Sequence, residues 1–265
     1  MQWVITKTYQ DGIGNVMKGF LSGFSIYPNT KIECNPDYSL GQYDTVLDSK
    51  HIYAAGPYQP FYTCRLLVLR SEEDDQPTIE NEFPYTNGCG NPMLNHNFST
   101  TKLIDWNYDP AKIHPRIRHR ILSAIDRIQF RPFVLEQVQS YTSQFGSGKT
   151  LGVSVRTWTA PHEKSIDRPY SFDVYKDVIC SNLEDVSTVV LSVDNLDVLP
   201  EYLKLLSNVH VIVLTPTGTE NPTQYAFIKM LTLAHCNVFI GNRISTFTEL
   251  VFWFSHHKTK VVTVF

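Results

Sequence analysis

The sequence predicts an α/β protein whose C-terminal half forms a parallel sheet covered by helices on both faces. Two observations lead to this prediction. Short runs rich in β-branched residues recur along this half, and helix-length amphipathic stretches separate them, as parallel strands with crossover connections require. The expected strands cover 151–155, 186–193, 209–214, 237–240 and 261–265, and the expected helices cover 172–181, 199–206, 223–235 and 246–256.

The N-terminal half is less regular and predicts a second, looser α/β unit. It opens with a strand over 2–8, a glycine-containing turn over 11–15 and an apolar helix over 16–26. Residues 71–110 are rich in Asn, Pro, Asp, Thr and Gly, which predicts long surface loops.

A long helical region over 113–141, interrupted at Pro132, is expected to join the two halves. We therefore expect an N-terminal lobe over 1–145 and a C-terminal lobe over 146–265, without repeats or a low-complexity linker.

Composition narrows the function classes. A net charge of -3 provides no general attraction to nucleic acid, so no nucleic-acid partner is expected. The five cysteines lack any closely spaced pair, which favours reduced thiols in a cytoplasmic protein over a zinc site or a disulfide framework. We expect no signal segment and no membrane span, since no apolar run is long enough.

One glycine-rich segment, Gly146 to Thr150, imitates a phosphate-binding P-loop. A true P-loop follows a strand and precedes a helix, whose N-terminus faces the phosphates. Here a helical stretch precedes the glycines and a strand follows them. The order is reversed, so an NTPase remains only a minor alternative.

A first candidate site residue is Arg156, which ends the predicted strand 151–155. Ligands of open α/β sheets bind beyond the carboxyl ends of the strands, and a guanidinium there suits a phosphate. A surface ion pair is the ordinary alternative for an arginine at this position.

A second signal is the turn after the predicted strand 237–240, where Ser245, Thr246 and Phe247 open an apolar helix. Ser245 or Thr246 is expected to cap this helix, with Glu249 near the capping-box position. A plain N-cap explains the hydroxyls. The functional interpretation adds that hydroxyls and free N–H groups at a helix start form an anion site.

These segments, with Gly12 to Asn15, resemble in order and spacing the fucosyltransferase superfamily of the GT-B fold, which includes nodulation, core N-glycan, protein-O- and xyloglucan fucosyltransferases. The resemblance implies two Rossmann-like lobes facing a cleft, with the acceptor on the N-terminal side and the nucleotide sugar on the C-terminal side. It implies an inverting, metal-independent transferase that uses a nucleotide sugar, GDP-fucose being favoured, and a glycan acceptor, with no other cofactor.

The resemblance also implies residue roles. Arg156 resembles the family's arginine on the donor β-phosphate, and Ser245, Thr246 and Phe247 resemble its diphosphate and nucleoside turn. Gly12, Gly14 and Asn15 resemble a loop that faces donor and acceptor, and Asp194 is similar in placement to an acidic residue on the donor side.

The sequence departs from the family pattern beside the arginine. Ser154 stands where many relatives have histidine, and Thr157 and Trp158 replace more usual polar residues. The donor is therefore open, with a UDP-sugar such as UDP-xylose as an alternative to GDP-fucose, and a carbohydrate-binding module without turnover is a further alternative.

Transfer requires stabilisation of the leaving diphosphate, which falls to Arg156 and the helix start at Ser245. Asp11 is the first candidate for the base that deprotonates the acceptor, although an aspartate before glycine is also common in turns. Asp194 is the second candidate, and some relatives have no clear base. A metal site is not expected, because the spacing of Asp194, Asn195 and Asp197 differs from that of acidic metal motifs.

Overall fold

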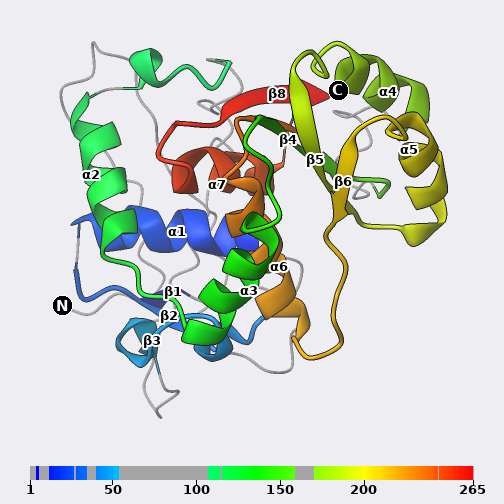
Figure 1. The fold of residues 1–265 in the computed structure, drawn as a ribbon. Coiled ribbons are helices and arrows are strands. Elements are labelled where there is room, and N and C mark those ends of the chain that lie inside the picture. Colours follow the sequence, from blue (N-terminus) through cyan, green and yellow to red (C-terminus); the bar gives the residue numbers. More distant parts are fainter. Residues whose placement is uncertain are drawn as a thin grey trace. The chain divides into compact units, whose positions relative to one another are not determined.

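The computed structural model describes residues 4–5, 12–26, 28–34, 40–53, 107–113, 115–158, 170–243 and 245–264. The chain divides into two compact units, one formed by 1–135 with 218–227 and the other by 136–217 with 228–265. Each unit contains a parallel sheet, as Figure 1 shows. Two helices, α3 (Pro132–Thr142) and α6 (Pro222–Leu233), each begin in the first unit and end in the second, and the expected lobes over 1–145 and 146–265 stay a prediction.

The second unit contains a five-stranded sheet in the order β6-β5-β4-β7-β8, with every neighbouring pair parallel. The predicted α/β class is thereby confirmed, with strand ends shifted by one or two residues. The strands are β4 (Lys149–Val155), β5 (Val186–Val193), β6 (His210–Val213), β7 (Val238–Asn242) and β8 (Lys260–Val264).

Helices cover both faces of this sheet. Tyr175 from α4 (Phe172–Cys180) and Tyr202 from α5 (Leu199–Leu205) are buried with alternate strand residues such as Val153. The opposite face meets α6 and α7 (Thr246–Phe254), because a Cβ placed on Gly152 would lie 3.0 Å from Leu233 and one on Gly241 would lie 2.5 Å from Thr248 Oγ1.

The strand order makes β4 and β7 the switch point of the sheet. From β4 the chain proceeds outward through β5 and β6, then returns to β7 on the other side of β4 and continues to β8. Connections therefore leave β4 and β7 toward opposite faces, and a crevice opens beyond their carboxyl ends. The candidate site lies there.

The first unit contains a three-stranded parallel sheet in the order β1-β2-β3. Its strands are β1 (Val4–Ile5), β2 (Lys31–Glu33) and β3 (Ile52–Tyr53), and its helices are α1 (Ile13–Ile26), α2 (Pro115–Asp126) and the start of α3. Short 3₁₀ segments occur at η1 (Tyr43–Thr45), η2 (Ser49–His51) and η5 (Pro110–Lys112) here, and at η6 (Leu196–Val198) in the second unit.

Two sequence expectations for this unit are wrong in detail. Helix α1 begins at Ile13, so Gly14 and Asn15 lie in its first turn rather than in the predicted loop. The expected interruption at Pro132 falls earlier, between α2 and α3, and Pro132 is the first residue of α3. Proline is well suited to a helix start, because its missing N–H has no intrahelical partner there. The predicted loops over 71–110 lie almost wholly outside the described residues.

Polar contacts bind 218–227 to the rest of the first unit. Asn221 Nδ2 donates to Thr45 Oγ1 over 2.9 Å, and Gln224 Nε2 donates to the Thr45 carbonyl over 3.2 Å. The Gln42 N–H donates to Thr223 Oγ1 over 3.2 Å. These bonds join segments some 180 residues apart and stabilise the start of α6.

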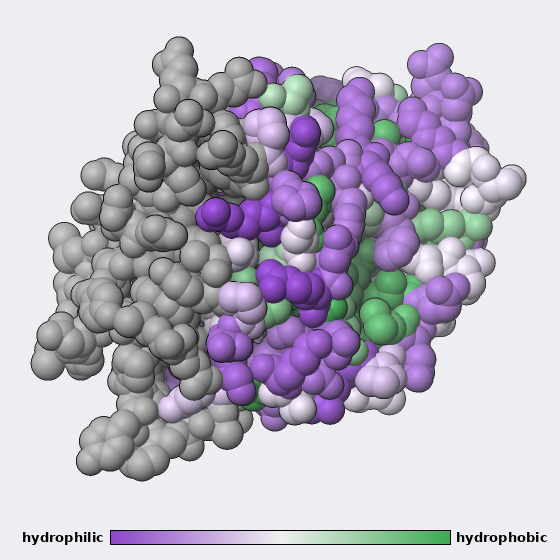
Figure 2. Space-filling view, turned by 90° about the vertical axis from the view of Figure 1, so that its left-hand side faces the viewer, coloured by the Kyte–Doolittle hydropathy of each residue, from purple (hydrophilic) through white to green (hydrophobic). Residues whose placement is uncertain are grey.

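No helix among the described residues combines the length and apolar composition that a bilayer crossing requires. Figure 2 shows that the described residues on the face in view are mainly hydrophilic, with hydrophobic residues in small groups between them. Such scattered apolar exposure is ordinary for a folded protein.

His51 provides a pH test of the first unit. Its ring is buried against Phe20 and Phe24, and its Nε2 accepts the Gln129 N–H over 3.1 Å. Burial, with a smaller effect of Lys50, lowers the pKa of His51 from 6.5 to about 4. As the pH falls, the unfolded chain protonates its His51 before the folded chain does. The contribution of His51 to the free energy of unfolding is therefore complete above pH 6.5 and is lost as the pH falls toward 4.

We predict that the urea midpoint of the wild type falls more steeply between pH 6.5 and 4.5 than that of His51→Gln. The glutamine amide oxygen is still able to accept the Gln129 N–H but does not titrate. Parallel pH profiles for the two proteins would contradict this assignment.

Candidate functional site

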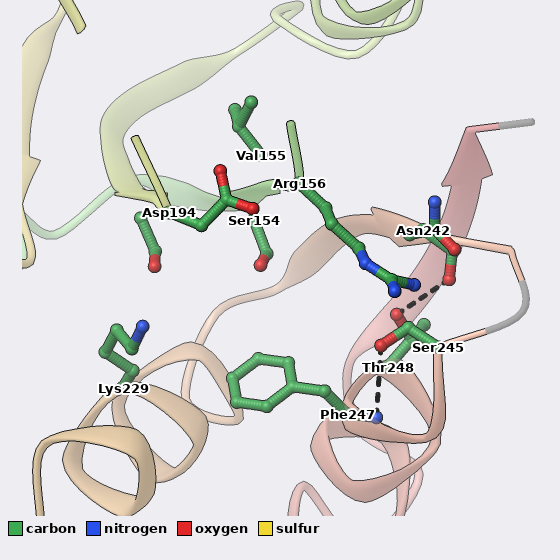
Figure 3. A pocket seen from close by; sticks show the side chains of 10 residues that line it. Ser154, Val155, Arg156, Asp194, Lys229, Asn242, Ser245, Phe247 and Thr248 are labelled. Atoms are coloured by element: carbon green, nitrogen blue, oxygen red, sulfur yellow. Dashed lines mark hydrogen bonds between the residues drawn. The ribbon is translucent and has the colours of Figure 1, made fainter. Parts of the chain in front are cut away.

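A cavity of about 150 Å³ lies within the second unit, beyond the carboxyl ends of its central strands. Figure 3 shows the side chains around it. The strands β4, β5 and β7, the segments that follow them, and the helices α6 and α7 all contribute to it. The described lining residues are Ser154, Val155, Arg156, Ser192, Asp194, Lys229, Asn242, Ser245, Phe247 and Thr248.

Small side chains leave this space open. Ser154 on β4 and Ser192 on β5 are register partners and follow Gly152 and Val190 on the face that meets α6 and α7. Larger side chains at these positions would occupy the cavity. Ser154 is also the departure from the family pattern noted in the sequence, so this departure directly affects the cavity wall.

Arg156 extends from the end of β4 into the crevice. The buried Tyr175 fixes this strand end, since its hydroxyl accepts the Arg156 N–H over 3.1 Å and donates to the Ser154 carbonyl over 3.4 Å. The guanidinium carbon lies 5.5 Å from the centroid of the exposed Trp158 ring. In Figure 3 the guanidinium points toward Asn242 and Ser245.

The start of α7 forms the wall opposite Arg156. Ser245 is the N-cap, as predicted, and its Oγ accepts the Phe247 N–H over 3.3 Å. The Thr248 N–H donates to the Ser245 carbonyl over 3.0 Å, and Thr248 Oγ1 donates to the Asn242 carbonyl over 2.9 Å. Of the N–H groups at this helix start, those of Phe247 and Thr248 are therefore not free, and an anion there would compete with Ser245 as the acceptor.

The predicted capping box is also wrong. With Ser245 as N-cap, the third helical position is Thr248, and Glu249 comes one residue later as a buried side chain. Thr248 lines the cavity with Ser245 and Phe247, while Thr246 is the first residue of α7.

Asp194 supports the segment that follows Arg156. Its carboxylate accepts the Thr157 N–H over 2.9 Å, the Thr157 hydroxyl over 2.7 Å and the Trp158 N–H over 3.4 Å. These bonds connect the end of β5 to the turn after β4. The structure thus gives Asp194 a positioning role at the cavity edge.

Sequence reasoning did not assign several residues of the cavity, and the most polar of these are Lys229 and Asn242. Lys229 lies on α6 between the buried residues Ile228 and Met230, and burial lowers the pKa of its ammonium while Asp194 partly offsets this shift. The only sequence signal was a lone lysine within an apolar helical stretch. Asn242 is the last residue of β7 and is 5% exposed. In the sequence it precedes the predicted helix cap, and no pattern there indicated a role for it.

The residues predicted for the other side of the donor belong to the first unit or fall outside the described residues. Gly12 directly precedes α1, and Gly14 and Asn15 lie in its first turn, all in the first unit. Asp11, the first candidate base, lies outside the described residues. The proposed roles of all four residues stay predictions.

The P-loop alternative finds no support in the local structure. Helix α3 ends at Thr142 and β4 begins at Lys149, so a strand rather than a helix follows the glycines. Lys149 Nζ donates to the Glu184 carbonyl over 3.2 Å, at the end of β4 opposite to Arg156.

The acidic group after β5 forms local turn contacts. Asn195 Oδ1 accepts the Asp197 N–H over 3.0 Å and caps η6. Within the ranges described, no cluster of three or more His, Cys, Asp or Glu side chains is arranged to hold a metal ion.

A five-stranded parallel sheet with this order, and a cavity at its switch point, is a Rossmann-like arrangement. Across nearly its full length, the chain has the fold of the GT-B fucosyltransferases. The resemblance inferred from the sequence is confirmed at the level of fold.

The structural relatives include POFUT1 and NodZ. A POFUT1 crystal structure in complex with GDP-fucose has a TM-score of 0.55 at 9% identity, covering 99% of this chain and 97% of that one. The apo form of POFUT1 has a TM-score of 0.56 at 11% identity, covering 99% and 97%. The NodZ α-1,6-fucosyltransferase soaked with GDP-fucose has a TM-score of 0.55 at 14% identity, covering 96% and 92%.

A related NodZ structure is from Bradyrhizobium, with a TM-score of 0.54 at 14% identity, covering 94% of this chain and 92% of that one. No protein-family model and no curated protein matches the sequence. At these identities the similarity establishes the fold and leaves activity and donor to be tested.

We predict that Asp194→Asn and Asp194→Ala differ in their affinity for pyrophosphate. The asparagine oxygen is still able to accept the Thr157 N–H, and loss of the negative charge favours an anion, so Asp194→Asn should bind at least as tightly as the wild type. Asp194→Ala leaves its three donors without their acceptor and should bind about tenfold more weakly than Asp194→Asn. Equal affinities in a calorimetric titration would contradict a positioning role.

Proposed function

We propose that this protein is a glycosyltransferase that moves a sugar, with fucose favoured, from a nucleoside diphosphate to a glycan acceptor. The main support is the shared cavity, at whose edge Arg156 and the start of α7 lie together. A guanidinium offers paired charge-assisted hydrogen bonds to phosphate, and a helix start favours negative charge. The shared fold with fucosyltransferases, one of which was crystallised with GDP-fucose, supports the same reaction class.

The size of the cavity matches part of such a donor. Sites that enclose a whole drug-sized ligand usually measure about 300 to 1,000 Å³. A cavity of about 150 Å³ has room for a diphosphate, so the nucleoside and the sugar would extend beyond it. The exposed Trp158 ring beside Arg156 is a flat apolar surface available to either of them.

Inverting, metal-independent transfer is the mechanism we propose. As the bond between sugar and diphosphate breaks, negative charge grows on the leaving phosphate. The backbone at Arg156 is fixed before the reaction by Tyr175, and Ser245 is fixed by its N-cap bond to the Phe247 N–H, which leaves the Ser245 O–H able to donate to the phosphate. Such preorganised groups stabilise developing charge without a cost of reorganisation during the step.

The base that would deprotonate the acceptor hydroxyl has one candidate outside the cavity. Asp194 is poorly suited to take a proton, because its oxygens already accept three N–H or O–H groups. Asp11, on the predicted acceptor side, therefore remains the candidate base. A mechanism without a side-chain base is the alternative already open in the sequence.

We predict that Arg156→Ala lowers transfer from the accepted donor by about 100- to 1,000-fold while leaving the melting temperature close to that of the wild type. Release of nucleoside diphosphate from GDP-fucose and from UDP-xylose measures the reaction and separates the two donor classes. Lys149→Ala is the matched control, because it removes a cation from the opposite end of the same strand.

Full activity in Arg156→Ala, or loss of activity in Lys149→Ala, would refute the assignment. Binding of a nucleotide sugar without turnover by the wild type would instead favour the carbohydrate-binding module.

A further inference from the structure

The cavity holds a second cation that the sequence reasoning did not assign. Lys229 projects from α6, whereas Arg156 projects from the end of β4, and both line the same space. In Figure 3 the two side chains enter the cavity from different sides, with Phe247 between α6 and the start of α7. Two positive groups therefore face one cavity of about 150 Å³.

The placement of Lys229 is unusual for a lysine. Lys229 itself is half-buried and lines the cavity, while its neighbours along α6, Ile228 and Met230, are almost completely buried. A charge placed there loses part of its hydration, and burial lowers its pKa accordingly. A bound anion would compensate for this loss.

Asp194 balances the charge of Lys229 only partly. Its charge opposes the effect of burial on Lys229, but its carboxylate oxygens accept hydrogen bonds from Thr157 and Trp158. Since the other described lining side chains are hydroxyls, an amide or apolar groups, Arg156 and Lys229 outnumber the single carboxylate among the described residues of the cavity.

We propose that Lys229 binds the second phosphate group of the ligand, so that the site selects a diphosphate over a monophosphate. This inference rests on the proposed function, and it specifies how the donor is held. Arg156 and the Ser245 turn bind one phosphate, and the ammonium of Lys229 binds the other. The residue is a binding residue for the leaving group and adds to its stabilisation as charge develops.

The test compares inorganic pyrophosphate with orthophosphate by calorimetric titration of the full chain. We expect the wild type to bind pyrophosphate at least tenfold more tightly. Lys229→Met keeps the apolar stem and removes the charge, so it should weaken pyrophosphate binding by about tenfold and change orthophosphate binding little. Lys229→Arg should retain most of the preference, and Lys149→Met, at the far end of β4, should leave both affinities unchanged.

Several results would overturn the inference: no pyrophosphate binding by the wild type, an unchanged preference in Lys229→Met, or an equal loss of both affinities. Lys229→Gln and a melting temperature for each variant guard against a folding defect of one substitution. The outcome is separate from that of the transfer assay. If the wild type shows no transfer activity, but Lys229→Met loses pyrophosphate binding selectively, the transferase is rejected and the two-cation site is kept.

Discussion

The candidate site depends on the reversal of strand order between β4 and β7. Because the chain leaves these two neighbouring strands in opposite directions across the sheet, a crevice opens beyond their ends among the residues that the structure describes. The small side chains of Ser154 and Ser192, on the sheet, leave this space open, and residues of α6 and α7 line its other sides. Every polar group of the cavity is placed by one of these elements, so the topology determines which residues meet.

The residues around the cavity fall into two groups with different tasks. Arg156 and Lys229 bring charge to the space. Tyr175 and Asp194 contact the backbone on either side of Arg156, one through a buried hydroxyl and the other through a carboxylate with three donors. A rigid backbone matters here, because small displacements of a charged group greatly reduce its effect on a reacting centre.

The second unit was predictable from the sequence because its elements are locally encoded. Runs such as Val186–Val193 are buried strands of β-branched residues, and Ser245 before an apolar stretch marks a helix start. Arg156 and Ser245 could be paired in advance, since both follow strands whose carboxyl ends lie at one edge of a parallel sheet.

Other features depend on contacts between distant residues and carried little local signal. Nothing near Asn221 in the sequence indicates that it bonds to Thr45 and assigns 218–227 to the first unit. Lys229 reads as a surface lysine until the fold places it in the lining of the cavity. The sequence indicated that Ser245 caps the helix. That its hydroxyl oxygen accepts the Phe247 N–H, so that this N–H is no longer free, could be learned only from the local geometry.

The central claim is that a diphosphate binds between Arg156 and the start of α7, and a crystal structure of the chain soaked with GDP tests it most directly. We predict phosphate oxygens within hydrogen-bonding distance of the Arg156 guanidinium and of the Ser245 hydroxyl or the Phe247 N–H. A diphosphate bound elsewhere, for instance beside Gly146 and Gly148, with the cavity at Arg156 left to solvent, would contradict the account.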